Sequence, residues 1–154
     1  MIAIDLGSNS LRVLEYDCVT YKATYTSEKV VKTADGLAQT GMVNDAAVQR
    51  VIATLKEAQE NIDFFGQPLT AVTTEAIRRA SNSEEVLGRI KKETGVSFDI
   101  ISGEEEARLT LLAVKQRLTK LQYASDSFVL VDIGGGSTEL IFHYGEETFS
   151  KSFK

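Results

Sequence analysis

The sequence predicts an α/β fold in which helices pack on a mixed β-sheet. An apolar strand at Ile2–Leu6 leads through a polar turn into a second apolar strand, and the same pattern recurs at Val129–Phe142. Between these two hairpins, stretches with helical spacing alternate with short apolar runs, which is typical of strand–helix crossovers. We therefore expect the order β-β-β-α-β-α-β-α-β-β-β.

The first half of the chain accounts for three strands, a helix and a fourth strand. The opening hairpin is followed by an apolar stretch at Tyr21–Val31 and then by a loop containing Gly36 and Gly41. Asn44 is suited to cap the helix that follows. Six apolar residues recur at helical spacing in that helix: Val48, Val51, Ile52, Leu55, Ala58 and Ile62. The short run Leu69–Thr73 is a buried strand that leads into residues 74–80.

The second half contains two helix starts with capping-box spacing. Asn82 and Glu85 begin one helix, which we expect to end at Gly95. Ser102 and Glu105 begin a longer helix after a strand at 96–101. Its apolar face follows steps of four and three residues: Ala107, Leu111, Val114, Leu118 and Leu121. After the second hairpin, residues 146–153 form the last strand.

Composition excludes several classes of protein. The length of 154 residues suits one domain, and a net charge of −5 argues against a broad nucleic-acid surface. The single cysteine, Cys18, rules out an internal disulfide, fits a reducing cytoplasm and is expected to be a small apolar filler. His143 is the only histidine, so the chain cannot contain a His-based metal site or a Ser-His-Asp triad. We expect no signal peptide and no membrane helix.

The two hairpin loops are candidate phosphate sites. One consists of Gly134, Gly135 and Gly136 followed by Ser137 and Thr138. Glycine allows close approach to the backbone, and successive N–H groups form a concavity for anionic oxygens. The alternative is a tight turn without a ligand, but such a turn needs only one or two glycines.

A shorter version of this loop closes the opening hairpin. It is made of Gly7, Ser8, Asn9 and Ser10. The three-glycine loop is neither a Walker A nor a Rossmann motif, because the closing Gly-Lys-Ser/Thr is missing and a strand follows instead of a helix. We expect the two loops to converge on one phosphate chain.

Carboxylates flank both loops: Asp5 precedes the first, and Asp132 and Glu139 surround the second. Carboxylates repel a phosphate unless a cation lies between them, and Mg²⁺ binds through one or two carboxylates together with phosphate oxygens. The alternative is simple solvation, which suits Glu139 better than Asp132. Asp132 ends an apolar strand, where an unpaired charge would be costly to bury.

Arginines are the candidate cations for phosphate. Arg78 and Arg79 follow a buried strand, and guanidinium groups bind phosphate oxygens bidentately. Adjacent helical residues point in different directions, so at most one of the two faces a site; surface solvation is the alternative. Arg12 lies two residues after Ser10, on the same face of its strand.

Three consecutive glutamates, Glu104, Glu105 and Glu106, crowd one helix N-terminus. Capping and the helix dipole explain them structurally. The same effects would lower a carboxylate pKa, which suits a group that activates water. The residues alone leave both readings open.

Four blocks give the chain a resemblance to a known family: Ile4–Ser10, Thr74–Asn82, Ile101–Leu109 and Asp132–Leu140. With the loop around Gly36 and Gly41, they resemble the exopolyphosphatase/guanosine pentaphosphate phosphatase family of the actin-like ATPase (ribonuclease H-like) superfamily. The resemblance implies an actin-like domain with a mixed five-stranded sheet.

The family's activity would be Mg²⁺-dependent release of terminal phosphate from inorganic polyphosphate, or of the 5′ γ-phosphate from guanosine pentaphosphate. By resemblance, the two loops and Arg78 would contact phosphate, with Arg12 as a second cation. Glu105, or alternatively Glu106, would orient or deprotonate the attacking water. Asp5, Asp132 and Glu139 would serve the metal, and Glu139 also the water.

Two departures from the family stand out. Glu75 occupies a position where the family commonly has a small residue, and its charge could weaken phosphate contact at Arg78. The family core has two similar domains, and residues 1–154 resemble the first alone. We expect the chain by itself to be weakly active or inactive.

Two other functions use the same loops. One is an actin-like kinase or polymer-forming ATPase, and the other is a non-catalytic module that binds polyphosphate or a guanosine alarmone. Neither a nucleic-acid nor a membrane partner is expected, and a homodimer is left open.

Overall fold

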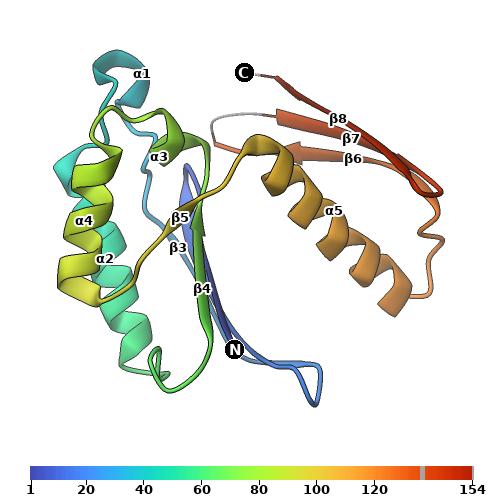
Figure 1. The fold of residues 1–154 in the computed structure, drawn as a ribbon, viewed down its shortest axis with the longest axis horizontal. Helices are drawn as coiled ribbons and strands as arrows, with labels where there is room; N and C mark the ends of the chain where they lie inside the picture. The colour runs from blue at the N-terminus through green and yellow to red at the C-terminus, as the bar shows by residue number, and fades with distance from the viewer. Residues whose placement is uncertain (136–137, 154) are drawn as a thin grey trace. The chain divides into compact units, whose positions relative to one another are not determined.

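The computed structural model describes residues 1–135 and 138–153. It consists of two compact units, residues 1–100 and 101–154, which are described separately (Figure 1). The α/β class and the mixed five-stranded sheet are confirmed in the first unit. The last three strands form a sheet of their own, which the sequence did not separate from the first.

The first unit has a sheet with the order β3-β2-β1-β4-β5. Its strands are β1 (Ile2–Leu6), β2 (Ser10–Asp17), β3 (Lys22–Val30), β4 (Leu69–Thr73) and β5 (Asp99–Ile100). The first three strands are antiparallel, whereas β4 runs parallel to β1 and β5 runs parallel to β4. The mixture arises because hairpins join β1 to β3 and helical crossovers join the rest.

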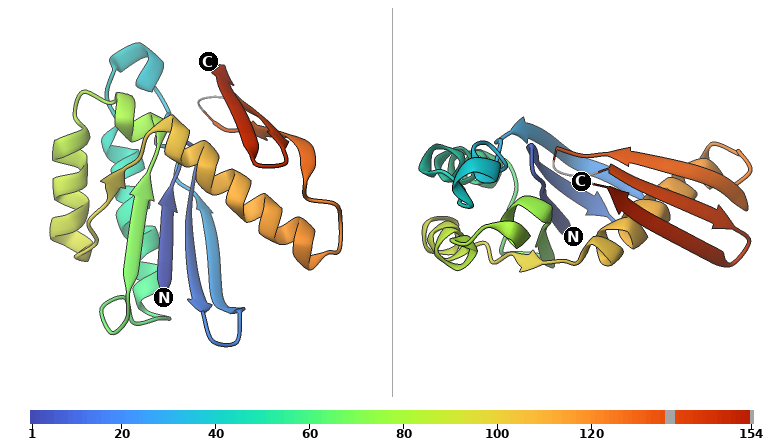
Figure 2. Two further views of the ribbon diagram at one scale, coloured as in Figure 1. Left: turned by 45° about the vertical axis from the view of Figure 1, so that its right-hand side comes forward. Right: turned by 90° about the horizontal axis from the view of Figure 1, so that it is seen from above.

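Four helices belong to this unit: α1 (Leu37–Thr40), α2 (Asp45–Gln59), α3 (Glu75–Arg79) and α4 (Ser83–Thr94). Figures 1 and 2 show α2 and α4 side by side, and their buried residues share one core with the inner face of the sheet. The predicted stripe of α2 is confirmed, since Val48, Val51, Ile52, Leu55 and Ala58 are buried and Ile62 packs against them.

The helix caps agree with the sequence in three cases and differ in one. The Asn44 side chain accepts from the N–H of Ala47, and Gly95 ends α4 with a left-handed φ of 75°. Ser102 likewise accepts from the N–H of Glu105. Asn82, however, makes no capping bond; its amide exchanges two hydrogen bonds with the backbone of Val43. A partner 39 residues away therefore replaces the local one.

Three other expectations need correction. The loop between Gly36 and Gly41 contains the short helix α1. The strand expected at 96–101 is paired only at Asp99–Ile100. Cys18 is exposed and is not an apolar filler, because it lies in the turn between β2 and β3.

The second unit packs one helix on a three-stranded antiparallel sheet with the order β6-β7-β8. Its elements are α5 (Gly103–Lys120), β6 (Ser127–Ile133), β7 (Thr138–Tyr144) and β8 (Glu147–Phe153). Ala107 and Leu111 of α5 meet Ile141 of β7 in a small core. The C-terminal part of the expected α5 face is less buried, and Leu121 is 46% exposed.

Within the described part of the chain, no helix has the length and apolar content needed to cross a membrane.

Candidate functional site

The backbone carbonyl groups of the loop between β1 and β2 are hydrogen-bonded to residues 31–34. The carbonyl oxygens of Gly7, Ser8 and Asn9 all accept hydrogen bonds from residues 31–34, at 2.7–3.0 Å. The N–H of Gly7 donates to the carbonyl of Ser10 at 2.9 Å. No described residue accepts from the N–H groups of Ser8 and Asn9. Two neighbouring N–H groups that remain available suit an anionic oxygen.

A row of charges crosses the open face of the first sheet beside this loop. Asp5, Arg12 and Glu28 are directly opposite one another on β1, β2 and β3. Arg12 Nη1 lies 3.7 Å from Asp5 Oδ2, and Arg12 Nη2 lies 3.1 Å from Glu28 Oε1. The sequence placed Arg12 on the same face as Ser10, and Arg12 Nη2 donates a hydrogen bond to Glu28. The hydrogen bond and the charge of Arg12, and to a smaller extent the Ser10 hydroxyl, lower the pKa of Glu28.

Arg78 lies on helix α3, which starts at the same end of the sheet as the β1–β2 loop. Leu6 at the end of β1 pairs with Thr73 at the end of parallel β4, and α3 follows directly. Ligands of open α/β sheets bind at the carboxyl ends of such strands. Arg78 Nη2 lies 2.6 Å from Glu75 Oε2, so the expected negative charge beside Arg78 is present. Arg79 is more exposed and lies 3.7 Å from the other Glu75 oxygen.

The second candidate loop joins β6 to β7 in the second unit. Gly134, Gly135 and Thr138 are described there, whereas Gly136 and Ser137 lie outside the described residues. Asp132 and Glu139 are directly opposite each other on the two strands that flank the loop. Like charges in that position are destabilising unless a cation or proton separates them.

Glu139 is the more buried of these two carboxylates, so the alternative of simple solvation, which suited Glu139 better than Asp132, does not describe it. It is 9% exposed, and its Oε1 accepts from the Ser152 hydroxyl at 2.8 Å. Asp132 is half-buried. The donor set of two carboxylates fits Mg²⁺, which takes few protein ligands and completes its shell with water and phosphate. The described residues contain no cluster of three or more metal-binding side chains, so a closed protein cage is not what they form.

The glutamates of α5 differ in their surroundings. Arg108 donates two hydrogen bonds to Glu105, at 2.8 Å from Nε and 2.7 Å from Nη2. These bonds lower the pKa of Glu105 more than the charge of Arg108 does. The sequence predicted the direction of the shift but attributed it to the helix N-terminus. Glu106 is half-buried one residue on.

Three supporting residues were missed by the sequence analysis. Arg108 could have been found, because i,i+3 spacing brings it over Glu105. Thr33 and Ser152 had no local signal, since their partners Gly7 and Glu139 lie 26 and 13 residues away.

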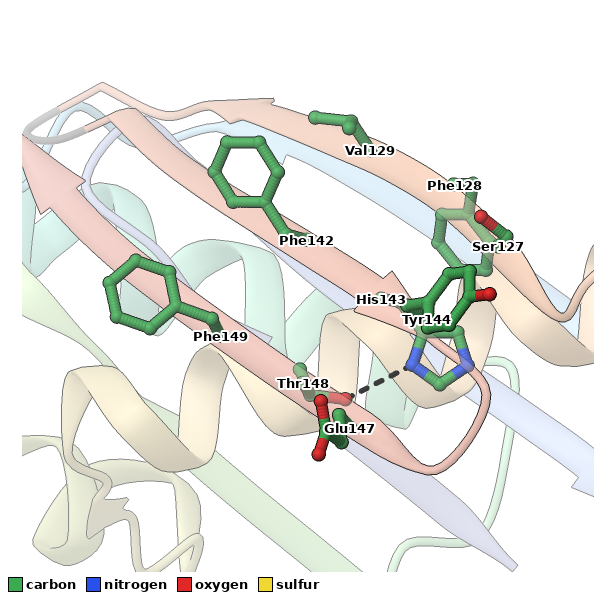
Figure 3. A pocket seen from close by; sticks show the side chains of 9 residues that line it. All are labelled: Ser127, Phe128, Val129, Phe142, His143, Tyr144, Glu147, Thr148 and Phe149. Carbon is green, nitrogen blue, oxygen red and sulfur yellow. Dashed lines mark hydrogen bonds between the residues drawn. The ribbon is translucent and has the colours of Figure 1, made fainter.

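A pocket of the second unit lies away from its glycine loop (Figure 3). Aromatic residues dominate its lining: Ser127, Phe128, Val129, Phe142, His143, Tyr144, Glu147, Thr148 and Phe149. Ser127 pairs with Tyr144, at the opposite end of the β6–β7 ladder from the loop. An apolar hollow there is unsuited to phosphate. His143 is 4% exposed, and its Nδ1 lies 3.0 Å from the Thr148 hydroxyl.

Comparison with known proteins decides the family. The model of the Ppx/GppA phosphatase family matches residues 18–153. The chain belongs to this family. Exopolyphosphatase 1 of Mycobacterium leprae is 32% identical over 151 residues, and that of Mycobacterium tuberculosis is 34% identical over 148. These matches cover 94% of the chain but only 43% and 42% of the relatives. The chain therefore spans less than half the length of these curated relatives.

Solved structures give the same family and fold. The crystal structure of the Aquifex aeolicus family member has a TM-score of 0.77 at 33% identity, covering 99% of this chain and 50% of that one. An exopolyphosphatase from Cytophaga hutchinsonii has a TM-score of 0.84 at 28% identity, covering 99% and 49%. The actin-like fold expected from the resemblance is thus confirmed.

Proposed function

We propose that the chain is part of a phosphohydrolase that releases terminal orthophosphate from inorganic polyphosphate. The observation that carries the proposal is the β1–β2 loop. Its three carbonyls are held by residues 31–34, no described residue accepts from its Ser8 and Asn9 N–H groups, and Arg12 lies on the strand that follows the loop. Membership of the Ppx/GppA family and the names of the mycobacterial relatives support the same reaction.

The proposed reaction is attack of water on the terminal phosphorus. A new P–O bond forms from the water oxygen, the bridging P–O bond breaks, and the shortened polyphosphate leaves with the bridging oxygen. Glu105 holds the water and accepts its proton, and Arg108 keeps that carboxylate ionised. The loop N–H groups, Arg12 and Arg78 bind the phosphate oxygens.

Mg²⁺ is part of the proposal, with Asp132 and Glu139 as the residues that would hold it and Asp5 as a third candidate. When bound, the ion would neutralise phosphate charge that the two carboxylates would otherwise repel. Ser152 fixes the Glu139 carboxylate in the strand ladder. The site would be completed by a second domain similar to the first, so we propose that residues 1–154 alone are weakly active or inactive.

Phosphate release from medium-chain polyphosphate tests the proposal. The 154-residue chain would be assayed with and without Mg²⁺, beside Mycobacterium tuberculosis exopolyphosphatase 1 as the active reference. Tripolyphosphate binding by calorimetry gives a second readout. The proposal is supported if the chain binds tripolyphosphate and Arg12→Leu weakens this binding. It is contradicted if the chain does not bind tripolyphosphate at any Mg²⁺ concentration. Guanosine pentaphosphate in the same calorimetric measurement shows which of the two candidate substrates the chain binds more tightly.

The role of Glu105 is tested in a longer polypeptide that is active. Glu105→Gln is expected to lower kcat by about 10²–10⁴-fold, the range of general acid–base catalysis. Glu106→Gln is the competing variant, and Glu104→Gln in the same helical turn is the control. Loss in Glu106→Gln alone would transfer the role to Glu106.

A further inference from the structure

Helix α3 contains a buried carboxylate between two arginines. Glu75 is the first residue of α3, and Arg78 and Arg79 follow at i+3 and i+4, the spacings that place side chains on one helical face. The Glu75 side chain is 9% exposed, compared with 28% for Arg78 and 51% for Arg79. Glu75 is therefore the most buried member of the group, whereas Arg78 is partly buried and Arg79 is exposed.

The contact with Arg78 is the strong one. Arg78 Nη2 lies 2.6 Å from Glu75 Oε2, a charge-assisted hydrogen bond, whereas Arg79 Nη1 is 3.7 Å from Glu75 Oε1. A buried charge is costly without such a partner, and removal of one partner of a buried pair leaves the other charge uncompensated. The bond fixes one nitrogen of a planar group whose N–H donors diverge in a rigid fork.

We propose that Glu75 is a positioning residue that holds the Arg78 guanidinium for phosphate. This inference rests on the proposed function, in which Arg78 contacts the phosphate chain. An arginine side chain that is ordered in advance does not lose its rotamer freedom when the ligand arrives. The same carboxylate cancels part of the arginine charge. Glu75 thus has two opposing effects, orientation that favours phosphate and charge that disfavours it.

Two neutral substitutions separate these effects. Glu75→Gln keeps the side-chain length and an oxygen that accepts from Nη2, but it removes the charge. Glu75→Ala removes both. The comparison of Gln with Ala therefore isolates orientation, and the comparison of wild type with Gln isolates charge.

The probe is inorganic tripolyphosphate, with affinity measured by calorimetry at low and high salt. Glu75→Gln is expected to bind about two- to tenfold more tightly than Glu75→Ala, the effect of ordering one long side chain. Glu75→Gln should also bind more tightly than wild type at low salt, and this gain should shrink at high salt because screening weakens charge effects. The Gln–Ala difference should persist at high salt.

Glu93→Gln is the matched control. Glu93 of α4 also pairs with two cations, Lys56 and Arg89, but it has no part in the proposed site. It should leave affinity unchanged. Thermal melts identify any variant that fails to fold.

A second readout needs no ligand. Nitrogen-15 NMR of the Arg78 side chain should show slower rotation of the guanidinium in wild type and Glu75→Gln than in Glu75→Ala. Equal mobility in all three overturns the inference, as does equal or tighter tripolyphosphate binding by Glu75→Ala than by Glu75→Gln. If neither the wild type nor any variant binds tripolyphosphate, the proposed function fails. The mobility of the Arg78 side chain still decides in that case whether Glu75 positions it.

Discussion

Strands β1–β3 and β6–β8 are two versions of one arrangement. Each is an antiparallel meander whose first strand carries an aspartate, Asp5 or Asp132, just before a glycine-containing loop. In both, the aspartate lies on the opposite face of its strand from a row of large aliphatic residues. The row is Ile2, Ile4 and Leu6 in one meander and Val129, Val131 and Ile133 in the other.

The two rows differ completely in burial. The residues of β1 are at most 1% exposed, because α2 and α4 pack on that face. Those of β6 are 51–78% exposed, and Phe142, Tyr144 and Phe149 extend the same face across β7 and β8. In the second unit it is the aspartate side that is packed, since Leu130 and Ile141 meet α5 there.

The difference shows that a glycine-containing loop after an aspartate strand can be held in place by different kinds of packing and hydrogen bonding. The first loop rests on a large core and is braced through its carbonyls by residues 31–34. The second rests on a sheet with a small core on one side, and its carboxylate Glu139 is held by a neighbouring strand. We expect the first support to be the more stable of the two.

The largest effect on stability is expected when the aliphatic rows of β1 and β6 are compared. Ile4→Ala should destabilise the first unit by about 2–5 kcal/mol, because it leaves a cavity in a packed core. Val131→Ala should cost less than about 1 kcal/mol, since the side chain is half exposed. Hydrogen exchange of individual amides measures each unit separately. A comparable loss for Val131→Ala would mean that its face is covered in solution.

The next test removes one hydroxyl from each loop support. Thr33→Val deletes the 2.7 Å bond to the Gly7 carbonyl and should cost about 1–3 kcal/mol, because Thr33 is 1% exposed and water cannot replace it. Ser152→Ala deletes the bond to Glu139 but should cost only about 0.5–1.5 kcal/mol, because exposed Ser152 can be replaced by water. Thr33→Ser, which keeps the hydroxyl, is the control in urea unfolding. Equal losses in Thr33→Val and Thr33→Ser would remove the hydrogen bond from the explanation.

A smaller effect is expected at the helix caps. Asn44 accepts from the Ala47 N–H and also donates to the Asp35 carbonyl, whereas Ser102 makes only the capping bond among those described. Asn44→Ala should therefore cost about 1–2 kcal/mol and Ser102→Ala about 0.5–1 kcal/mol. Urea unfolding of both variants shows which substitution lowers the free energy of unfolding more. A larger loss at Ser102 would contradict it.

Local patterns in the sequence were sufficient where the structure depends on neighbours along the chain. Spacing that a helix or strand imposes by itself accounts for the α2 stripe, the Asn44 cap and the sequential order of the strands along the chain. The face shared by Ser10 and Arg12 followed from strand alternation alone. The resemblance, rather than the pattern, supplied the roles expected for Arg78 and Glu105.

The remainder depended on contacts between distant segments. Asn82 has the spacing of a capping box, yet its amide is better satisfied by two bonds to Val43. The brace on the first loop comes from residues 31–34, which have no unusual composition. The burial of Glu75 could not be read from its position on a five-residue helix. Such contacts are set by which side chains meet when the sheet forms.

The smallest effect concerns two arginine–glutamate pairs, one in each unit. Arg108 lowers the pKa of Glu105, and Arg12 lowers the pKa of Glu28 with added help from the Ser10 hydroxyl. Because both pKa values are lowered on folding, each pair adds stability above the ordinary glutamate pKa, and this stability is lost as the pH falls through the lowered value. Both carboxylates are exposed, so the contribution to stability is small.

NMR titration of the carboxyl carbons reads the two pairs directly. Arg108→Leu should return the Glu105 midpoint upward to its ordinary range, because the arginine supplies both lowering effects. Arg12→Leu should raise the Glu28 midpoint only in part, since the Ser10 hydroxyl also lowers this pKa. If Glu105 is the proposed base, the acid limb of kcat/KM in an active longer polypeptide should move to higher pH with Arg108→Leu. An acid limb that stays in place while the Glu105 midpoint moves would separate Glu105 from the chemistry and favour Glu106.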